Sequence, residues 1–207
     1  MMIRLAWTGD AGRPGPCEKQ NLHMPAKPTR PALLIVDMLN LLDFDAGGIL
    51  LKQAIPVADR IASLKQRFKR AGAPVIYAND NFGQWHADFR ELVAVCTHES
   101  CRGSPLAKRL APDPDDFYIL KPKQSAFHST PLAVLLEHCQ ARRVVVTGIS
   151  TDVCVAATAI DAHMRDLQVH VPSDCVAAPT RARTARALAM LHESIGASCA
   201  ASRSIRP

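Results

Sequence analysis

The chain alternates short, uninterrupted apolar runs with longer segments in which apolar residues recur at the spacing of a helix. Such runs are typical of strands covered on both faces of a parallel sheet, and the helical spacing is typical of amphipathic helices. We expect strands at residues 32–38, 73–80, 116–121, 143–148 and 167–174, with a short sixth strand at 197–202. We expect helices at residues 54–71, 130–139, 152–166 and 180–195. This alternation predicts an α/β fold with a parallel sheet between two layers of helices.

Residues with known preferences for helix ends support these boundaries. Gly72 stands where a helix commonly ends in a left-handed glycine, and Thr130 followed by Pro131 is typical of a helix start. For the helix after the fourth strand, Thr151 or Asp152 is available as the N-cap. These helix-end residues therefore agree with the helices that the apolar spacing predicts.

The chain has 207 residues, a length that suits one domain with a substantial core. Residues 1–30 are rich in Pro, Gly and polar residues and predict a flexible extension, so we expect a single domain at residues 31–207. No apolar run is long enough to span a bilayer, and the first residues lack the apolar core of a secretory signal. We therefore expect a cytoplasmic protein that does not enter a membrane.

The net charge of +6 resides at the two ends of the chain. Residues 1–30 sum to +3 and residues 180–207 sum to +4, which leaves −1 for the residues between them. Solvated ends explain this distribution better than a nucleic-acid surface does. Seven cysteines at irregular spacings favour reduced thiols over a disulfide framework.

Polar residues at strand ends are the candidates for chemistry, because ligands bind at the carboxyl edge of such sheets. Asp37 follows five apolar residues, and Lys121 likewise ends an apolar strand. Burial makes either charge costly unless a partner meets it. The competing interpretation of Asp37 is an aspartate that only accepts a hydrogen bond from a loop N–H group. The competing interpretation of Lys121 is a surface lysine exposed to solvent.

Cys154 lies near the start of the helix that follows the fourth strand. Free N–H groups and the positive helix end there favour a thiolate with a lowered pKa, and they can also bind an oxyanion. A cysteine in an apolar helix is, however, often there for packing alone. These arguments leave chemistry and packing evenly balanced.

Three segments shift that balance. "LLIVDM" contains Asp37, "LKPKQSAFHST" contains Lys121, and "VTGISTDVCVAATAIDA" contains Cys154. In this order and spacing they resemble the signature segments of the isochorismatase-like cysteine hydrolases, over about residues 31–202. The resemblance implies a three-layer α/β/α fold with a six-stranded, mostly parallel sheet, and a homodimer or homotetramer.

The resemblance also implies roles for these residues. Cys154 is expected to be the nucleophile, Asp37 the base that takes its proton, and Lys121 the cation that holds Asp37 ionised. Backbone N–H groups of Ser150 and Cys154 are expected to form an oxyanion hole, and the Ile149–Ser150 peptide is expected to be cis. The predicted function is hydrolysis of a C–N bond in a small amide or ureido compound, through a thioester and without a cofactor.

The segment after the second strand departs from the metal-binding nicotinamidases of this family. It reads "ANDNFGQWHADF" and lacks their aspartate–x–histidine motif with a second histidine, so nicotinamide and a metal are both disfavoured. "CTHESC", with Cys96, His98 and Cys101, offers only three ligands at an irregular spacing and is a weak zinc candidate. Residues 81–116 form the least regular region and predict a lid or substrate-facing insertion. The residues that we expect to line a substrate pocket are Asn79, Asn81, Phe82, Trp85 and Phe127.

Three alternatives remain open. The first is a nicotinamidase-type amidase that uses a metal. The second is a binding module on the same fold, which would require a missing catalytic residue. The third is a thiol redox protein, which the absence of a C-x-x-C motif disfavours.

Overall fold

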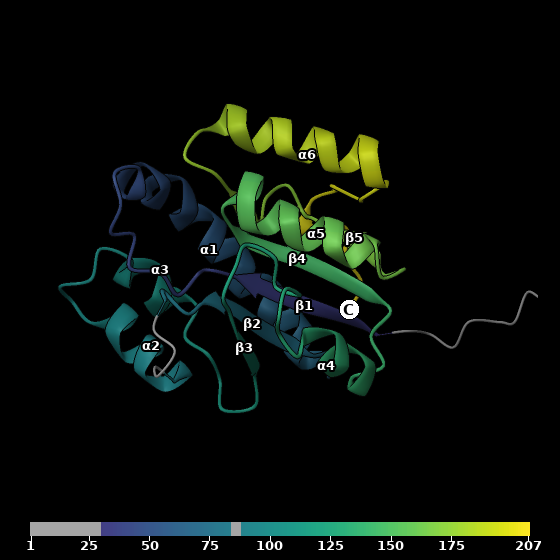
Figure 1. Cartoon of the computed structure of the whole chain (residues 1–207), viewed down its shortest axis with the longest axis horizontal. Coiled ribbons are helices and arrows are strands. Elements are labelled where there is room, and N and C mark those ends of the chain that lie inside the picture. The colour runs from purple at the N-terminus through teal and green to yellow at the C-terminus, as the bar shows by residue number, and fades with distance from the viewer. Residues whose placement is uncertain (1–29, 84–87) are drawn as a thin grey trace, which may run out of the picture.

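The computed structural model describes residues 30–83 and 88–207 as a six-stranded parallel sheet flanked by helices (Figure 1). The predicted extension at residues 1–30 lies outside the described residues except for Arg30. The strands are β1 (Pro31–Val36), β2 (Val75–Asp80), β3 (Phe117–Lys121), β4 (Arg143–Ile149), β5 (Gln168–His170) and β6 (Val176–Ala177). The helices are α1 (Gly47–Arg70), α2 (Phe89–Thr97), α3 (Ser104–Arg109), α4 (Leu132–His138), α5 (Ala156–His163) and α6 (Arg181–Ile195). A π-helical turn, η1 (Thr151–Val155), precedes α5, and a 3-10 turn, η2 (Ser202–Ser204), follows α6.

The sheet has the order β3-β2-β1-β4-β5, and β6 pairs with β4 beyond the end of β5. Every pair is parallel, so all strands point their carboxyl ends to one edge. The central strand β1 is buried along its whole length, as its uninterrupted apolar sequence predicts. The carboxyl ends of its neighbours β2 and β4 therefore lie beside the carboxyl end of β1.

Alternate residues of β1 enter two separate cores, which makes the fold a three-layer α/β/α sandwich. Leu33 and Ile35 pack with α1, α2 and α3, whereas Leu34 and Val36 pack with α4, α5 and α6. In Figure 1, α4 and α5 cover the face of the sheet turned toward the viewer, and α1 lies behind it. The predicted fold class is confirmed.

Some predicted boundaries were wrong. The sixth strand is β6, not residues 197–202, where Ser198 makes only an isolated bridge to His170. Helix α1 begins at Gly47, seven residues before its predicted start. The helix predicted at 152–166 is divided into η1 and α5, with Ser150 at the N-cap position and no side-chain cap.

The irregular region at 81–116 contains two helices that the apolar pattern did not reveal. α2 begins with a capping box, in which the Asp88 carboxylate accepts from the Glu91 N–H and the Glu91 carboxylate accepts from the Asp88 N–H. α3 has a proline near its start, Pro105. Both helices pack into the core with α1, so most of this region belongs to the folded body.

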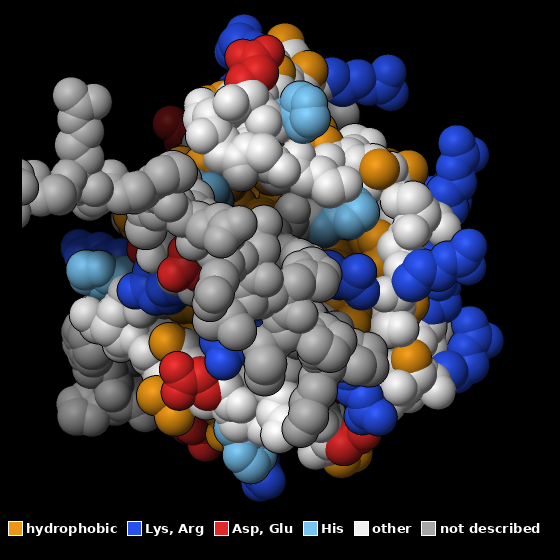
Figure 2. All heavy atoms as spheres, turned by 90° about the vertical axis from the view of Figure 1, so that its right-hand side faces the viewer, with side chains coloured by type: hydrophobic (Ala, Val, Ile, Leu, Met, Phe, Trp, Pro, Cys, Tyr) orange, Lys and Arg blue, Asp and Glu red, His pale blue; other side chains and the backbone are white. Residues whose placement is uncertain are grey.

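On the face shown in Figure 2, many Lys and Arg side chains lie along the right-hand edge, and others are scattered over the rest of the face. No helix in the described part of the chain combines the length and apolar character needed to cross a membrane.

Candidate active site

The carboxyl edge of the sheet brings together three residues that are far apart in the sequence. Asp37 directly follows β1, Lys121 is the last residue of β3, and Cys154 lies in η1 after β4. Asp37 has a φ of 52°, a left-handed conformation that turns the chain sharply at the end of its strand. Topology, not sequence proximity, therefore creates this cluster.

Lys121 lies at the centre of the cluster. Its Nζ atom is 2.9 Å from Asp37 Oδ2 and donates to Cys154 Sγ at 3.6 Å and to the Lys123 carbonyl at 3.2 Å. The Lys121 side chain is fully buried and that of Asp37 nearly so. Because the ammonium has three N–H donors, these contacts satisfy it completely.

The backbone of β4 lies unusually close to that of β1 just before these residues. Gly148, on β4 beside β1, has a φ of 113°, and a Cβ atom at this position would lie 2.0 Å from the Val36 carbonyl oxygen. Only glycine allows the two strands to lie so close immediately before Asp37 and the turn that carries Cys154. The peptide bond between Ile149 and Ser150 is cis, as predicted.

Burial and charge set the protonation of the cluster. Burial raises the pKa of Asp37 above its ordinary value of 3.8, although Lys121 and a hydrogen bond from Cys154 oppose this shift. Burial lowers the pKa of Lys121, but the neighbouring Asp37 and Cys154 outweigh it and leave that pKa raised. The result is a lysine that keeps its charge beside a carboxylate that accepts protons readily.

The expected lowering of the Cys154 pKa was wrong. Burial, followed by the negative charge of Asp37, raises the pKa of the Cys154 thiol to about 12, and Lys121 offsets only part of this. The sulfur therefore keeps its proton at neutral pH and donates it toward Asp37. Such a thiol needs the carboxylate as a base at the moment of attack.

Asp80 is a third charged residue at this edge, beside Asp37 and Lys121. Its backbone N–H donates to Asp37 Oδ1 at 2.8 Å, and its Oδ2 atom lies 3.8 Å from Lys121 Nζ. Its Oδ1 atom accepts from the Phe82 N–H. Asp80 stands at the polar end of β2, where the sequence places candidates for chemistry, but its contacts with Asp37 and Lys121 become visible only in the structure.

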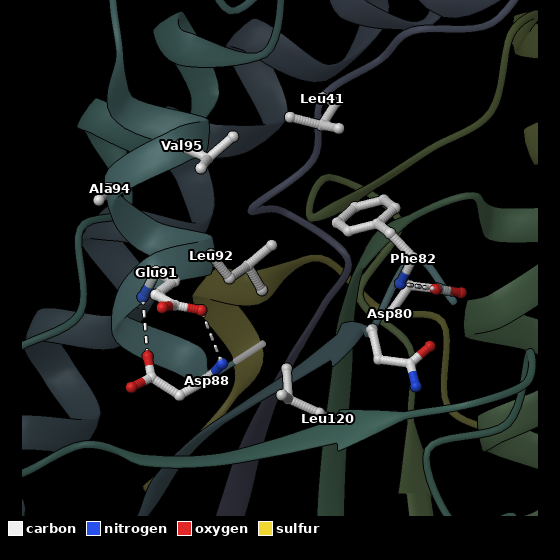
Figure 3. A pocket seen from close by; sticks show the side chains of 10 residues that line it. Leu41, Asp80, Phe82, Asp88, Glu91, Leu92, Ala94, Val95 and Leu120 are labelled. Carbon is white, nitrogen blue, oxygen red and sulfur yellow. Dashed lines mark hydrogen bonds between the residues drawn. The ribbon is translucent and has the colours of Figure 1, made fainter. Parts of the chain in front are cut away.

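A cavity of about 410 Å³ opens beside Asp80 (Figure 3). It lies between α2, the segment after β1 and the segment after β2, and Phe82 and Leu92 form part of its apolar wall. Asp80, Asp88 and Glu91 also line it. Its volume is in the range of small-molecule sites.

Some of the predicted pocket residues line this cavity and others do not. Asn81 and Phe82 line the cavity. Asn79 is fully buried, with its Nδ2 donating to the Leu39 carbonyl, and Phe127 packs in the opposite core; neither lines the cavity. Trp85 lies outside the described residues.

The described residues do not offer a metal site at this edge. Their one cluster of three potential ligands is Asp113, Asp115 and Asp116, and these carboxylates already pair with Lys65 and Lys69. Cys96, His98 and Cys101 do not converge, because Cys96 is buried in the core whereas His98 binds the exposed Ser100. At the site itself, both oxygens of Asp80 face groups of the protein.

A parallel α/β/α sandwich with this cluster at its carboxyl edge has the architecture of the isochorismatase-like hydrolases. A structure of N-carbamoylsarcosine amidase from Thermoplasma acidophilum superimposes with a TM-score of 0.65 at 25% identity, covering 86% of this chain and 100% of that one. The nicotinamidase SaPncA from Staphylococcus aureus gives a TM-score of 0.62 at 26% identity, covering 83% and 98%.

The sequence comparisons agree with the fold. Residues 31–203 match the model of the isochorismatase domain. The isochorismatase family protein YaaI of Bacillus subtilis (strain 168) is 39% identical over 160 residues, covering 77% of this chain and 87% of that protein. The chain therefore belongs to the isochorismatase family. It is a hydrolase with amidohydrolase and nicotinamidase relatives, in keeping with action on C–N bonds other than peptide bonds.

Proposed function

We propose that the protein hydrolyses a C–N bond of a small amide or ureido compound through a thioester on Cys154. The observation that carries the proposal is the position of Lys121 Nζ, which contacts both the Asp37 carboxylate at 2.9 Å and the Cys154 sulfur at 3.6 Å. Nucleophile, base and cation are thus within reach of one another at the edge where such sheets bind ligands.

In the proposed first step, Asp37 takes the thiol proton as the sulfur attacks the substrate carbonyl carbon. The carbonyl electron pair moves to oxygen, and backbone N–H groups of Ser150 and Cys154 stabilise this oxyanion. Asp37 then delivers its proton to the leaving nitrogen, and the C–N bond breaks to leave an acyl group on sulfur. Water activated by Asp37 hydrolyses the thioester and restores the thiol.

Lys121 acts on the base rather than on the substrate. Its ammonium is buried and held by Asp37, Cys154 and the Lys123 carbonyl. This charge lowers the cost of ionising Asp37 in a dry environment and of developing negative charge on sulfur. No step of the proposal runs through a metal or an organic cofactor.

The substrate is proposed to place its body in the cavity beside Asp80. Phe82, Leu92 and Leu120 supply apolar contacts there, and Asn81 supplies an amide group. Asp80 links the cavity to the reacting groups because it also contacts Lys121. A small amide with an apolar portion fits this wall.

A screen of primary amides, ureido acids and nicotinamide for ammonia release tests the function. Cys154→Ala serves as the blank, and Cys139→Ala, at a partly buried free cysteine after α4, serves as the matched control. We expect one or more compounds to be hydrolysed by the wild type and by Cys139→Ala but not by Cys154→Ala. Equal hydrolysis by Cys154→Ala would overturn the thioester route. Ligand binding by the wild type with no turnover of any bound compound would favour a binding module.

We further propose one domain at residues 31–207, which assembles as a homodimer or homotetramer in the cytoplasm. All six described cysteines are free, which suits a reducing compartment. The edge strand β3 exposes Tyr118 and Phe117, which suits burial against another copy. Light scattering on the purified chain measures the assembly, and a monomer at all concentrations would contradict it.

A further inference from the structure

A chain of polar contacts links α6 to the turn that carries the nucleophile. The Ser150 hydroxyl donates to Asp152 Oδ1 at 2.6 Å, and Arg183 Nε donates to Asp152 Oδ2 at 2.5 Å. Ser150 and Asp152 belong to the turn around η1, whereas Arg183 lies in the first turn of α6, 31 residues after Asp152. These two contacts occupy both oxygens of the carboxylate.

We propose that Arg183 is a positioning residue, which acts through Asp152 to hold the Ser150 backbone N–H in place for the oxyanion. This inference rests on the proposed function, in which Ser150 supplies one of the oxyanion donors. Arg183 itself makes no ion pair or hydrogen bond with Asp37, Lys121 or Cys154. Its effect on the reaction must therefore pass through the turn.

Hydrogen bonds hold Ser150 through both its backbone and its side chain. Its carbonyl oxygen accepts from the N–H groups of Val153 and Val155, which fixes one side of the residue to η1. Its hydroxyl is fixed by Asp152, and Asp152 is fixed in turn by Arg183. The charged hydrogen bonds hold the pKa of Asp152 below its usual value despite burial, so the carboxylate is ionised and keeps both contacts.

The position of α6 makes Arg183 a firm anchor. Thr180 caps the helix by accepting from the Arg183 N–H, and Thr184 accepts from the Ala178 N–H. The first turn of α6 is therefore fixed at two points to the segment that follows β6. A donor held this way restrains Asp152 more than a solvent-exposed arginine on a free loop would.

A contact that only joined α6 to η1 would affect stability and nothing else. The two roles are separable because one thiol reacts with two kinds of electrophile. With p-nitrophenyl acetate, the sulfur bonds to the carbonyl carbon, an oxyanion forms, and p-nitrophenolate leaves to give the acetyl thioester. With iodoacetamide, the sulfur bonds to carbon and iodide leaves, so no oxyanion forms. In both reactions Asp37 takes the thiol proton.

The experiment measures both rates at Cys154 in the full-length chain, with the Cys154→Ala background subtracted. We expect Arg183→Ala to slow acylation about tenfold, since the donor is displaced rather than removed. Alkylation should stay within about twofold of the wild type. Arg183→Lys should recover part of the acylation rate, because an ammonium can still pair with Asp152.

Two further variants complete the test. Arg186→Ala removes an exposed arginine one turn along α6 that makes no ion pair with a described residue, and it should leave both rates unchanged. The double variant with Arg183→Ala and Asp152→Ala should be acylated no more slowly than Asp152→Ala alone, because Arg183 acts through Asp152.

The outcomes separate this inference from the proposed function. If Arg183→Ala leaves acylation at the wild-type rate, or slows acylation and alkylation equally, the positioning role is wrong although the hydrolase assignment stands. Additive losses in the double variant would also contradict it. If the wild type acylates no faster than Cys154→Ala, the proposed function itself fails.

Discussion

Lys65 and Lys121 are both buried lysines paired with aspartate, yet their other partners differ. Lys65 Nζ contacts Asp116 Oδ2 at 2.7 Å, Tyr77 Oη at 3.1 Å and the Ala111 carbonyl at 3.0 Å. Lys121 replaces the tyrosine with a thiol that also faces a carboxylate. A buried ammonium alone therefore does not mark a reactive site.

Their places in the fold separate them further. Lys65 extends from the C-terminal part of α1 to Tyr77 in the interior of β2, and it also binds Ala111 and Asp116 in the segment before β3. Lys121 lies at the carboxyl edge, beside Asp80 and its cavity. Lys65 has carboxylates and a tyrosine hydroxyl as its side-chain partners, whereas Lys121 also contacts a thiol.

The largest expected difference follows from changing the aspartate of each pair. Asp37→Asn keeps the shape of the side chain but cannot accept the thiol proton, so kcat per folded molecule should fall about 10³-fold. The change also leaves the buried Lys121 ammonium without its counter-ion, so the unfolding midpoint should fall as well. Asp116→Asn should leave kcat per folded molecule unchanged. Steady-state ammonia release together with thermal unfolding measures both, and full activity in Asp37→Asn would make Asp37 structural.

The second expected difference concerns stability. Lys65→Ala leaves the Asp116 carboxylate, whose side chain is only 1% exposed, with Lys69 as its remaining cation. Removing one partner of a buried pair costs about 3–5 kcal/mol, and because Lys69 still pairs with Asp116 the free energy of unfolding should fall by about 3 kcal/mol, the lower end of this range. Urea unfolding measures it, with Lys52→Ala, at an exposed position of the same helix, as the control. A loss no greater than in Lys52→Ala would mean that Lys65 contributes no net stability.

The smallest expected effect is a shift in pH dependence. Only ionised Asp37 accepts the thiol proton, and burial raises its pKa above 3.8. Activity should therefore be lost as the pH falls through this raised pKa, at a higher pH than an exposed aspartate would give. The pH profile of kcat/KM measures this acidic limb, and a limb at or below 3.8 would show that Asp37 is not the base.

The strand ends made the central cluster predictable. Asp37, Lys121 and Cys154 each follow a clear apolar run, and parallel strands bring their carboxyl ends together. The Cys154 pKa was not predictable from helix position, because burial and the charge of Asp37 depend on the assembled site. The contact of Arg183 with Asp152 was likewise hidden, since it joins residues on separate elements.

Helix α2 and strand β6 were not predicted from the sequence, and they differ in whether a local sequence signal marks them. Helix α2 had a local signal, the Asp88 and Glu91 capping box, that could have revealed it. Strand β6 had none, because it has two residues and exists only through pairing with Gly148 and Ile149 of β4. Local chemistry can be predicted from sequence, whereas pairings set by the assembled fold cannot.

In the proposed mechanism, acyl transfer to the Cys154 sulfur lies on the reaction path. Mass spectrometry of the intact protein, quenched in acid during turnover of the fastest amide from the screen, tests this directly. We expect a mass increase equal to the acyl group, located by proteolysis on the peptide that contains Cys154 and absent from Cys154→Ala. Hydrolysis that continues at the wild-type rate in Cys154→Ala, with no adduct on Cys154 in the wild type, would contradict it.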